Sequence, residues 1–312
     1  MKGLVVGDMH LDGKVGTKRV VDFFNIIKNS ITDNLEIQKE TDFVVLLGDY
    51  GMTPSMDNSY RQVLSEFIAS FGDKPVIALL GQHDRNLAGH ILQPIAPLCK
   101  NLTVVESVLE WEGMTFISHN RDTKQLEKDI KAAKPGLVFG HFNINGYETD
   151  SKVLDSAIHV DMPEHKFILG DIHKSQKQKN VIYVGSIAPV DLGQLQYDFG
   201  IGLVDSKAKE FKKIPIEYTF NVVKLNSEDD FAKINAMSRI IIKVKDKKEK
   251  AVWRAKLQDK EYLSLEFVEE GVEIKKEKLE VNVNFTTMVS KYLKMIGKEH
   301  LEQKIKEYME RV

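Results

Sequence analysis

The sequence has few of the features that stabilise secreted or membrane-bound proteins. Cys99 is the single cysteine in 312 residues, which excludes a disulfide framework and a cysteine-based zinc site. No apolar run approaches the ~18 residues that a bilayer-spanning helix needs. The opening residues MKGLVVGDMH turn polar too soon for a signal peptide. We therefore expect a cytoplasmic protein without a membrane partner.

The chain also has no large net charge. The chain has 44 Lys or Arg and 46 Asp or Glu, so its net charge is -2 at pH 7. Through Asp205 there are 20 basic and 27 acidic residues, and from Ser206 onward there are 24 and 19. The acidic part suits a site that collects divalent cations and argues against nucleic-acid binding by charge alone. The basic part contacts nucleic acid or is simply a solvated surface, which is the commoner case.

Short apolar runs in the first two-thirds of the chain predict buried strands. The runs are LVVGD at 4–8, FVVLLGD at 43–49, PVIALLG at 75–81, LVFGH at 137–141, FILGD at 167–171 and VIYVGS at 181–186. Helical patterns near 17–30 and 56–71 separate the first three runs. This alternation predicts a layered α/β domain.

A second unit begins near residue 214. Its strand-like runs are FNVVKL, RIIIKVK and YLSLEFV, with helical patterns at 227–237 and 251–259. In the tail, apolar residues recur at i, i+3, i+4 and i+7, first over 285–296 and again over 301–312, which predicts two amphipathic helices. These helices pack on their own domain or hold a partner. We expect three parts: 1–213, a small α+β domain at 214–282, and a helical segment at 283–312.

Five short motifs each follow an apolar run. They are Gly7-Asp8-Met9-His10, Gly48-Asp49, Gly81-Gln82-His83-Asp84, Gly140-His141 and Gly170-Asp171-Ile172-His173. A lone Gly-Asp is more often a turn, and a lone histidine is more often a structural residue. Ligands of open α/β sheets lie at the carboxyl ends of the strands. The five motifs together therefore predict one site.

The residue types in these motifs are those of a two-metal hydrolase. Carboxylates and imidazoles suit Mn²⁺, Fe²⁺ or Zn²⁺, and Mg²⁺ where oxygen ligands dominate. Asp49 would bridge two ions ~3.5–4 Å apart, which bind a phosphodiester and activate a water molecule. His83 could protonate the leaving oxygen or stabilise the charge on the phosphoryl group.

The order of the motifs resembles that of the calcineurin-like metallophosphoesterases: Asp-x-His, Gly-Asp, Gly-Asn-His-Asp, Gly-His and Gly-His-x-His. Within that family the chain is most similar to the SbcD-type recombination nucleases, including their tailed-phage homologues. The stretches VFGHFNINGY at 138–147 and VIYVGSIA at 181–188 support this subgroup. The C-terminal helices lie where family members grip the coiled coil of an ATPase partner.

The resemblance implies a layered metallophosphoesterase β-sandwich flanked by helices, with a small α+β capping domain and C-terminal helices. It implies that Asp8, His10 and His173 hold a first metal ion, with Asp49 as the bridging ligand. Gln82, His141 and Asp171 would hold the second ion. His83 would be the catalytic histidine, and Asp84 would orient it.

The implied activity is that of a metal-dependent DNA exonuclease and endonuclease, the nuclease subunit of an SbcCD-type repair and recombination complex. It would use two divalent ions, Mn²⁺ or alternatively Mg²⁺. Its partners would be DNA, an SbcC-type ATPase bound through the C-terminal helices, and a second copy in a homodimer. The alternatives are a small-molecule phosphodiesterase or phosphatase, and a scaffold with a weakened second metal site.

Two residues depart from the family pattern. Gln82 replaces asparagine and offers the same carbonyl on a longer arm, while Asp171 replaces histidine. The added carboxylate favours harder ions such as Mn²⁺ or Mg²⁺. The second site is therefore either adapted to a different metal preference or weakened. Beside the motifs, His119 could reach the substrate or be a loop residue, and the lysines of 174–179 could contact DNA or be solvated.

Overall fold

The computed structural model describes most of the first 269 residues. The described ranges are 1–11, 39–51, 58–87, 89–149, 153–155, 158–188, 194, 196–216, 221–234, 238–260 and 264–269. The helix expected near 17–30 and the two helices expected within 283–312 lie outside these ranges. No helix among the described residues is long and apolar enough to cross a bilayer.

The first six-stranded sheet carries three of the five motifs. Its order is β14-β13-β1-β2-β3-β6, and β1, β2, β3 and β6 run parallel. The strands are β1 (Lys2–Val6), β2 (Phe43–Leu46), β3 (Val76–Leu79), β6 (Leu102–Val105), β13 (Gly200–Asp205) and β14 (Glu210–Pro215). Because parallel strands end at one edge, the residues that follow β1, β2 and β3 lie side by side.

The second six-stranded sheet carries the other two motifs. Its order is β11-β12-β10-β9-β8-β7, with β8, β9, β10 and β12 parallel. The strands are β7 (Val108–Trp111), β8 (Met114–Ile117), β9 (Leu137–His141), β10 (Lys166–Gly170), β11 (Gln176–Gln178) and β12 (Val181–Tyr183). Between β3 and β6 in sequence lie the short ribbon β4 (Arg85–Asn86) and β5 (Gly89–His90) and the 3-10 turn η1 (Ala96–Leu98).

The two sheets face each other across a hydrophobic core. Val5 of β1 packs in that core with residues of both sheets, such as Ile77 and Phe139. Its neighbours Leu4 and Val6 point the other way and pack against Phe67 of helix α3 (Asn58–Ala69). This alternation is the period of two that a strand imposes. The central strands β1, β2 and β3 therefore have two buried faces.

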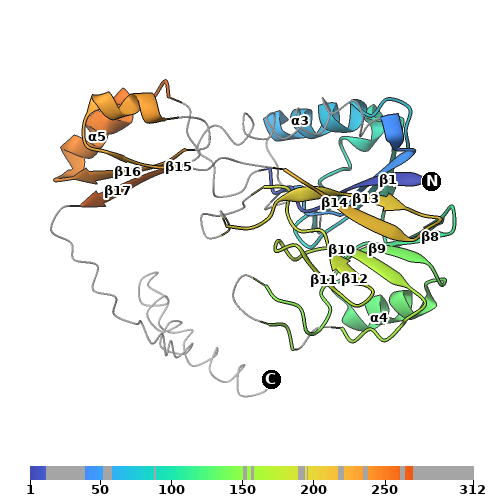
Figure 1. Cartoon of the computed structure of the whole chain (residues 1–312). Helices are drawn as coiled ribbons and strands as arrows, with labels where there is room; N and C mark the ends of the chain where they lie inside the picture. The colour runs from blue at the N-terminus through green and yellow to red at the C-terminus, as the bar shows by residue number, and fades with distance from the viewer. Residues whose placement is uncertain are drawn as a thin grey trace, which may run out of the picture. The chain divides into compact units, whose positions relative to one another are not determined.

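A helix covers the outer face of each sheet. Helix α3 lies over the first sheet, and helix α4 (Thr123–Ala132) lies over the second, where Leu126 and Ile130 are buried (Figure 1). The Asp122 carboxylate caps α4 by accepting from the amides of Lys124 and Gln125. The layers are thus helix, sheet, sheet and helix, which is the flanked β-sandwich that the sequence predicts.

The six expected strands are all present, several of them with shorter ends. The run at 43–49 ends as a strand at Leu46, since Gly48 and Asp49 have φ of 108° and 51°. Left-handed backbone cannot continue a strand, so the strand stops where the motif begins. Beyond residue 200, β14 continues to Pro215. The domain boundary at 213 stays a prediction.

The small unit after residue 220 has three parallel strands. They are β15 (Asn221–Leu225), β16 (Ser238–Val244) and β17 (Ser264–Glu269), in the order β15-β16-β17. The 3-10 helix η3 (Glu228–Lys233) and helix α5 (Lys247–Lys256) connect them. Ile240 and Ile242 pack with Trp253 and Leu257 in a separate core.

Two helix predictions in this unit need correction. The helix expected at 227–237 is the shorter η3, because Ile234 after it is extended with ψ of 132°. The helix expected at 251–259 is α5, which begins at Lys247. Its N-cap is Asp246, which accepts from the amides of Lys248 and Glu249. The first turn of α5 is charged throughout, so apolar periodicity does not reveal it.

Candidate metal centre

The five motifs meet at one edge of the sandwich. Asp8 and His10 follow β1, Asp49 follows β2, and His83 follows β3. In the second sheet His141 ends β9, while Asp171 and His173 follow β10. The parallel pairing of each sheet sets its motifs side by side, and the stacking of the sheets sets the two groups face to face.

Backbone hydrogen bonds tie these loops to one another. The amides of Met9 and His10 both donate to the Asp49 carbonyl, at 3.1 and 3.0 Å. The Asp171 amide donates to both carboxylate oxygens of Asp8, at 3.1 and 3.2 Å. The Ile187 amide donates to the Asp8 carbonyl at 3.2 Å. These hydrogen bonds therefore hold the loops in register with one another.

Several of the candidate ligands have left-handed backbone. His10, Asp49 and Asp171 have φ of 44°, 51° and 83°. Asp and His tolerate this region better than most residues, although it still costs energy. Backbone strain of this kind collects at functional sites, where the surrounding structure enforces it.

Gly81 is a glycine because the backbone of Asp49 passes directly beside it. A Cβ at Gly81 would lie 2.1 Å from Asp49 Oδ1 and 2.6 Å from Asp49 N. No side chain fits at these distances. The Gly-Gln-His-Asp motif therefore owes its glycine to the close approach of Asp49.

Asp8, His10 and His173 form a first group of candidate ligands, with atoms within 4.8 Å of one another. The Nε2 atoms of His10 and His173 are 3.0 Å apart. Burial, with the neighbouring His173, lowers the pKa of His10 to about 4. His10 is therefore neutral near pH 7 and has a lone pair to offer a cation.

Asp8, Asp49 and His141 form a second group under the same limit of 4.8 Å. Asp49 Oδ2 lies 3.5 Å from His141 Nε2, 3.8 Å from His10 Nε2 and 3.9 Å from His83 Nε2. The two groups share Asp8, and Asp49 Oδ2 reaches a histidine of each. Both carboxylates thus lie between the two sets of ligands.

The donor atoms fit divalent cations. Asp49 Oδ2 and His141 Nε2 are buried and make no hydrogen bond to any described residue. Such orphaned polar atoms are costly unless another group satisfies them. His141 Nδ1 lies 2.7 Å from the Leu47 carbonyl, so it carries the proton and leaves Nε2 directed at the site.

The electrostatics of the second group favour positive charge at its centre. Burial opposes charge on Asp49, but the positive charge of His141 outweighs it and lowers the pKa of Asp49. Burial likewise opposes charge on His141, and Asp49 raises its pKa well above the usual value. The pocket thus stabilises a proton, and by the same charges a metal cation, between these residues.

Gln82 and Asp171, the two departures from the family pattern, contact each other. The Gln82 amide donates to Asp171 Oδ1 at 3.3 Å. Asp171 belongs to neither group of three, and Gln82 is exposed. Burial raises the pKa of Asp171 to about 6, and the charges of Asp8 and Asp49 add to this effect. Their role as ligands of the second ion stays a prediction.

His83 lies at the mouth of the site. Its side chain is 36% exposed, and its backbone amide donates to Asp49 Oδ1 at 2.9 Å. An imidazole that is both close to Asp49 and open to solvent can reach a bound substrate. His119 lies further out, with its ring centroid 6.4 Å from that of His141.

The Asp84 carboxylate contacts backbone amides, and its expected role in orienting His83 stays a prediction. Its carboxylate accepts from the backbone amides of Asp49, Tyr50 and Gly81, at 2.7, 2.9 and 2.7 Å. No hydrogen bond joins it to the His83 ring among the described residues. Burial, with the charge of Asp49, raises the pKa of Asp84 to about 7. The residue is a buried backbone clamp.

Gln194 is a site residue without any motif signal. It is buried, and its Nε2 lies 2.8 Å from His173 Nδ1. An amide beside Nδ1 fixes the ring and turns Nε2 toward His10. A single glutamine beyond the last motif carries no recognisable pattern, so only the fold could reveal it.

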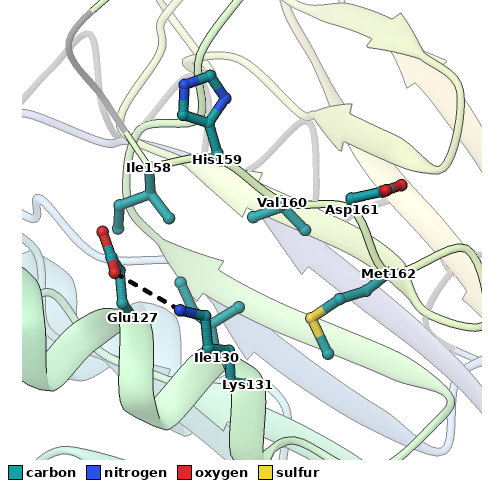
Figure 2. Close-up of a pocket in the computed structure, with 8 residues that line it drawn as sticks. All are labelled: Glu127, Ile130, Lys131, Ile158, His159, Val160, Asp161 and Met162. Carbon is teal, nitrogen blue, oxygen red and sulfur yellow. Dashed lines mark ion pairs between the residues drawn. The ribbon is translucent and has the colours of Figure 1, made fainter.

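A separate pocket of about 250 Å³ lies between α4 and the segment 158–162 (Figure 2). An ion pair between Glu127 and Lys131, 3.7 Å long, borders it. Its lining combines apolar and charged side chains: Glu127, Ile130, Lys131, Ile158, His159, Val160, Asp161 and Met162. None of these residues belongs to the candidate metal centre.

Comparisons with solved structures give weak likenesses. A novel archaeal phosphodiesterase matches 69% of this chain and 100% of its own, with 17% identity and a TM-score of 0.40. The protein TT1561 of Thermus thermophilus matches 69% and 98%, with 12% identity and a TM-score of 0.43. AQ665 of Aquifex aeolicus, a protein of unknown function, matches 46% and 80%, with 16% identity and a TM-score of 0.28. These values are too low to carry an argument.

The family comparison is decisive. No curated protein matches the sequence. The model of the family described as calcineurin-like phosphoesterase matches residues 1–191, a range that contains every member of both candidate ligand groups. The chain therefore belongs to the calcineurin-like phosphoesterases, which hydrolyse phosphoesters with divalent metal ions.

Proposed function

We propose that the chain is a DNA nuclease, the catalytic subunit of an SbcCD-type repair and recombination complex. The observation that carries the proposal is the paired ligand groups around Asp8 and Asp49, in a chain whose motifs resemble the SbcD subgroup. The reaction is hydrolysis of DNA phosphodiesters, from ends and within single strands.

The residues of the centre have distinct tasks in this reaction. Bound divalent cations would neutralise the phosphodiester and make a water molecule more acidic. Asp8 and Asp49, each between the two groups, keep the charge of the centre negative enough to hold both cations. The buried loops around them exclude bulk water, which strengthens every charge interaction inside.

His83 delivers the proton in this proposal. Its ring is the exposed imidazole beside Asp49 Oδ2, 3.9 Å away. From there it can donate to the oxygen that leaves phosphorus. Loss of the ring should therefore slow cleavage of DNA, whose leaving alkoxide needs a proton. Diesters with an acidic leaving group should be affected less.

A cationic stripe on α5 supports a nucleic-acid substrate. Lys247, Lys250 and Arg254 recur at i, i+3 and i+7, and with Ala251 they line a hollow of about 410 Å³. None of the three forms an ion pair with a described residue. Lys250 Nζ and Arg254 Cζ lie 5.2 and 5.6 Å from the centroid of the Phe267 ring. The stripe spans ~10 Å along the helix, about three nucleotide steps of one DNA strand.

The remaining parts of the proposal concern metal and partners. We propose Mn²⁺ as the ion, because Asp171 adds a carboxylate where the family has an imidazole. The ATPase partner would bind the helices expected within 283–312, and the nuclease would act as a homodimer in the cytoplasm. Deletion of 284–312 should then abolish ATPase binding while metal-dependent hydrolysis of a small diester persists.

The central experiment measures cleavage of labelled single- and double-stranded DNA with Mn²⁺, Mg²⁺ or EDTA. Hydrolysis of bis-p-nitrophenyl phosphate is measured beside it. Metal-dependent DNA cleavage that Asp49→Ala abolishes is the expected result. Hydrolysis of the small diester alone would instead indicate a small-molecule phosphodiesterase. Inactivity on both substrates, even with the ATPase present, would indicate a scaffold.

The stripe on α5 can be tested apart from the chemistry. Replacement of Lys247, Lys250 and Arg254 by alanine should weaken DNA binding in EDTA. It should also lower the slope of log affinity against log salt by about two to three. Lys243→Ala is the matched control, since Lys243 is exposed on the sheet face opposite α5. An equal loss in the control would contradict a specific role for the stripe.

A further inference from the structure

The Asp84 carboxylate is the convergence point of three backbone amides. Asp49 N and Gly81 N both donate to Oδ2 at 2.7 Å, and Tyr50 N donates to Oδ1 at 2.9 Å. The residue is fully buried. Asp84 therefore links the loop after β2 to the loop after β3 through its side chain.

Asp49 forms a second link between the same two loops. Its Oδ1 accepts from the His83 amide at 2.9 Å. With Oδ1 held there, the other oxygen, Oδ2, is the one that faces the imidazoles of His10, His83 and His141. The two loops thus exchange hydrogen bonds in both directions, and the rotation of the Asp49 carboxylate is fixed by them.

The geometry calls for a carboxylate at position 84. Three N–H donors converge on two oxygens, and both oxygens are used. An asparagine would turn an NH₂ group toward at least one of these donors, which leaves buried donors facing each other. Asp49 also has a left-handed φ of 51°. An amide held by a charged acceptor helps to keep it in that conformation.

We propose that Asp84 is a positioning residue that sets the Asp49 carboxylate for metal binding, and that it acts on Asp49 and not on His83. The proposal deepens the function proposed above but rests only on its metal-dependent chemistry. DNA need not be the substrate. Failure of the DNA nuclease assignment would therefore leave it standing, and it can fail while that assignment holds.

The test uses Asp84→Asn in the full chain, with Ile130→Val as the control for general destabilisation. Ile130 is buried on α4 and belongs to none of the five motifs. Mn²⁺ affinity is measured by titration calorimetry well below the melting temperature of each protein. Amide hydrogen exchange is measured on the metal-free proteins.

We expect Asp84→Asn to bind Mn²⁺ about 10-fold or more weakly, the usual effect of losing a group that orients a metal ligand. Exchange at Asp49, Tyr50 and Gly81 should accelerate, while amides in β9 and β10 stay protected. Ile130→Val should lower the melting temperature and leave the Mn²⁺ affinity unchanged. Unchanged Mn²⁺ affinity in Asp84→Asn would overturn the proposal.

If Asp84 acted through His83 instead, the Asp84→Asn variant would give different results. Asp84→Asn would then slow cleavage of diesters with poor leaving groups and spare bis-p-nitrophenyl phosphate, with Mn²⁺ affinity intact. If Asp84→Asn does not fold, amide hydrogen exchange of the wild-type protein tests the proposal instead. The amides of Asp49, Tyr50 and Gly81 must exchange as slowly as those of β2 in the metal-free protein. Fast exchange at these three positions contradicts the clamp.

Discussion

The two halves of the metal centre are built differently. Asp8 and His10 of the first group are 0% and 5% exposed, and the Asp8 carboxylate is tied to the backbone of Asp171. In the second half, His141 is fully buried, but Gln82 is exposed and meets Asp171 through a single 3.3 Å hydrogen bond. The second group of three is buried throughout and the first includes the partly buried His173, so the contrast lies between these two groups and the more open pair Gln82 and Asp171.

The difference shows where sequence change is tolerated in this site. Both departures from the family pattern, Gln82 and Asp171, lie outside the two groups of three, and every residue within those groups matches the family pattern. A buried ligand has neighbours on all sides that a longer or differently charged side chain would disturb. An exposed residue can change length and be compensated by one partner, as Gln82 and Asp171 indicate.

The largest effect should come from Asp49, whose Oδ2 lies close to His10 of the first group and His141 of the second. Asp49→Asn removes the charge but keeps the shape, and asparagine tolerates left-handed backbone. Hydrolysis of bis-p-nitrophenyl phosphate should fall by roughly 10³-fold or more, because both cations lose a carboxylate. Steady-state kinetics with saturating Mn²⁺ measure this. Activity within tenfold of wild type would show that the halves do not meet at Asp49.

The halves should also differ in metal affinity. Titration with Mn²⁺ should resolve two sites, the tighter one at Asp8, His10 and His173, with dissociation constants ~10-fold apart or more. His173→Ala should remove the tight site and leave the weaker one. Calorimetry on the metal-free protein resolves the two phases. A loss of the weak phase in this variant would reverse the assignment.

A smaller effect should reveal whether Gln82 and Asp171 are adapted to each other. Gln82→Asn and Asp171→His each break the hydrogen bond between the two side chains, so each alone should weaken the second Mn²⁺ site. The double variant should lose less Mn²⁺ binding free energy than the two single variants lose together, with a coupling energy of about 1 kcal/mol. The four dissociation constants form a double-mutant cycle. A gain of affinity in the double variant above wild type would mean that the present site is weakened.

The smallest effect is expected far from both halves. Asp122→Ala removes the cap of α4, where the carboxylate accepts from two amides at 3.0 and 3.2 Å. It should cost about 1 kcal/mol and lower the melting temperature by ~2–4 °C. Mn²⁺ affinity should not change. A thermal melt with and without Mn²⁺ checks both parts, and any loss of metal binding would show that the site is sensitive to general stability.

The sequence predicts the layers and the site because both rest on local patterns. Each of the six buried runs packs on both faces, so it is apolar throughout and easily recognised. The strand β7 is short, and its residues alternate between more and less exposed positions. Four residues of this kind carry too little pattern to be distinguished from a loop.

What the sequence could not reveal depends on contacts between distant residues. The hydrogen bond between Gln194 and His173 joins a residue without a motif to one with a motif. The family resemblance implies that Asp84 acts on its neighbour His83. The folded chain instead turns the carboxylate back toward Asp49, 35 residues away. Such pairings are set by loop geometry and not by residue type.

The ties between Asp8 and Asp171, 163 residues apart in sequence, have a consequence for the newly made chain. The centre cannot close until β10 and the loop after it have left the ribosome, and at ~5–20 residues per second this takes roughly ten seconds or more after Asp8 emerges. A nascent or truncated chain that ends before residue 171 lacks Asp171 and His173. During synthesis the metal centre is thus the last part of the sandwich edge to be completed, because its ligands come from both sheets.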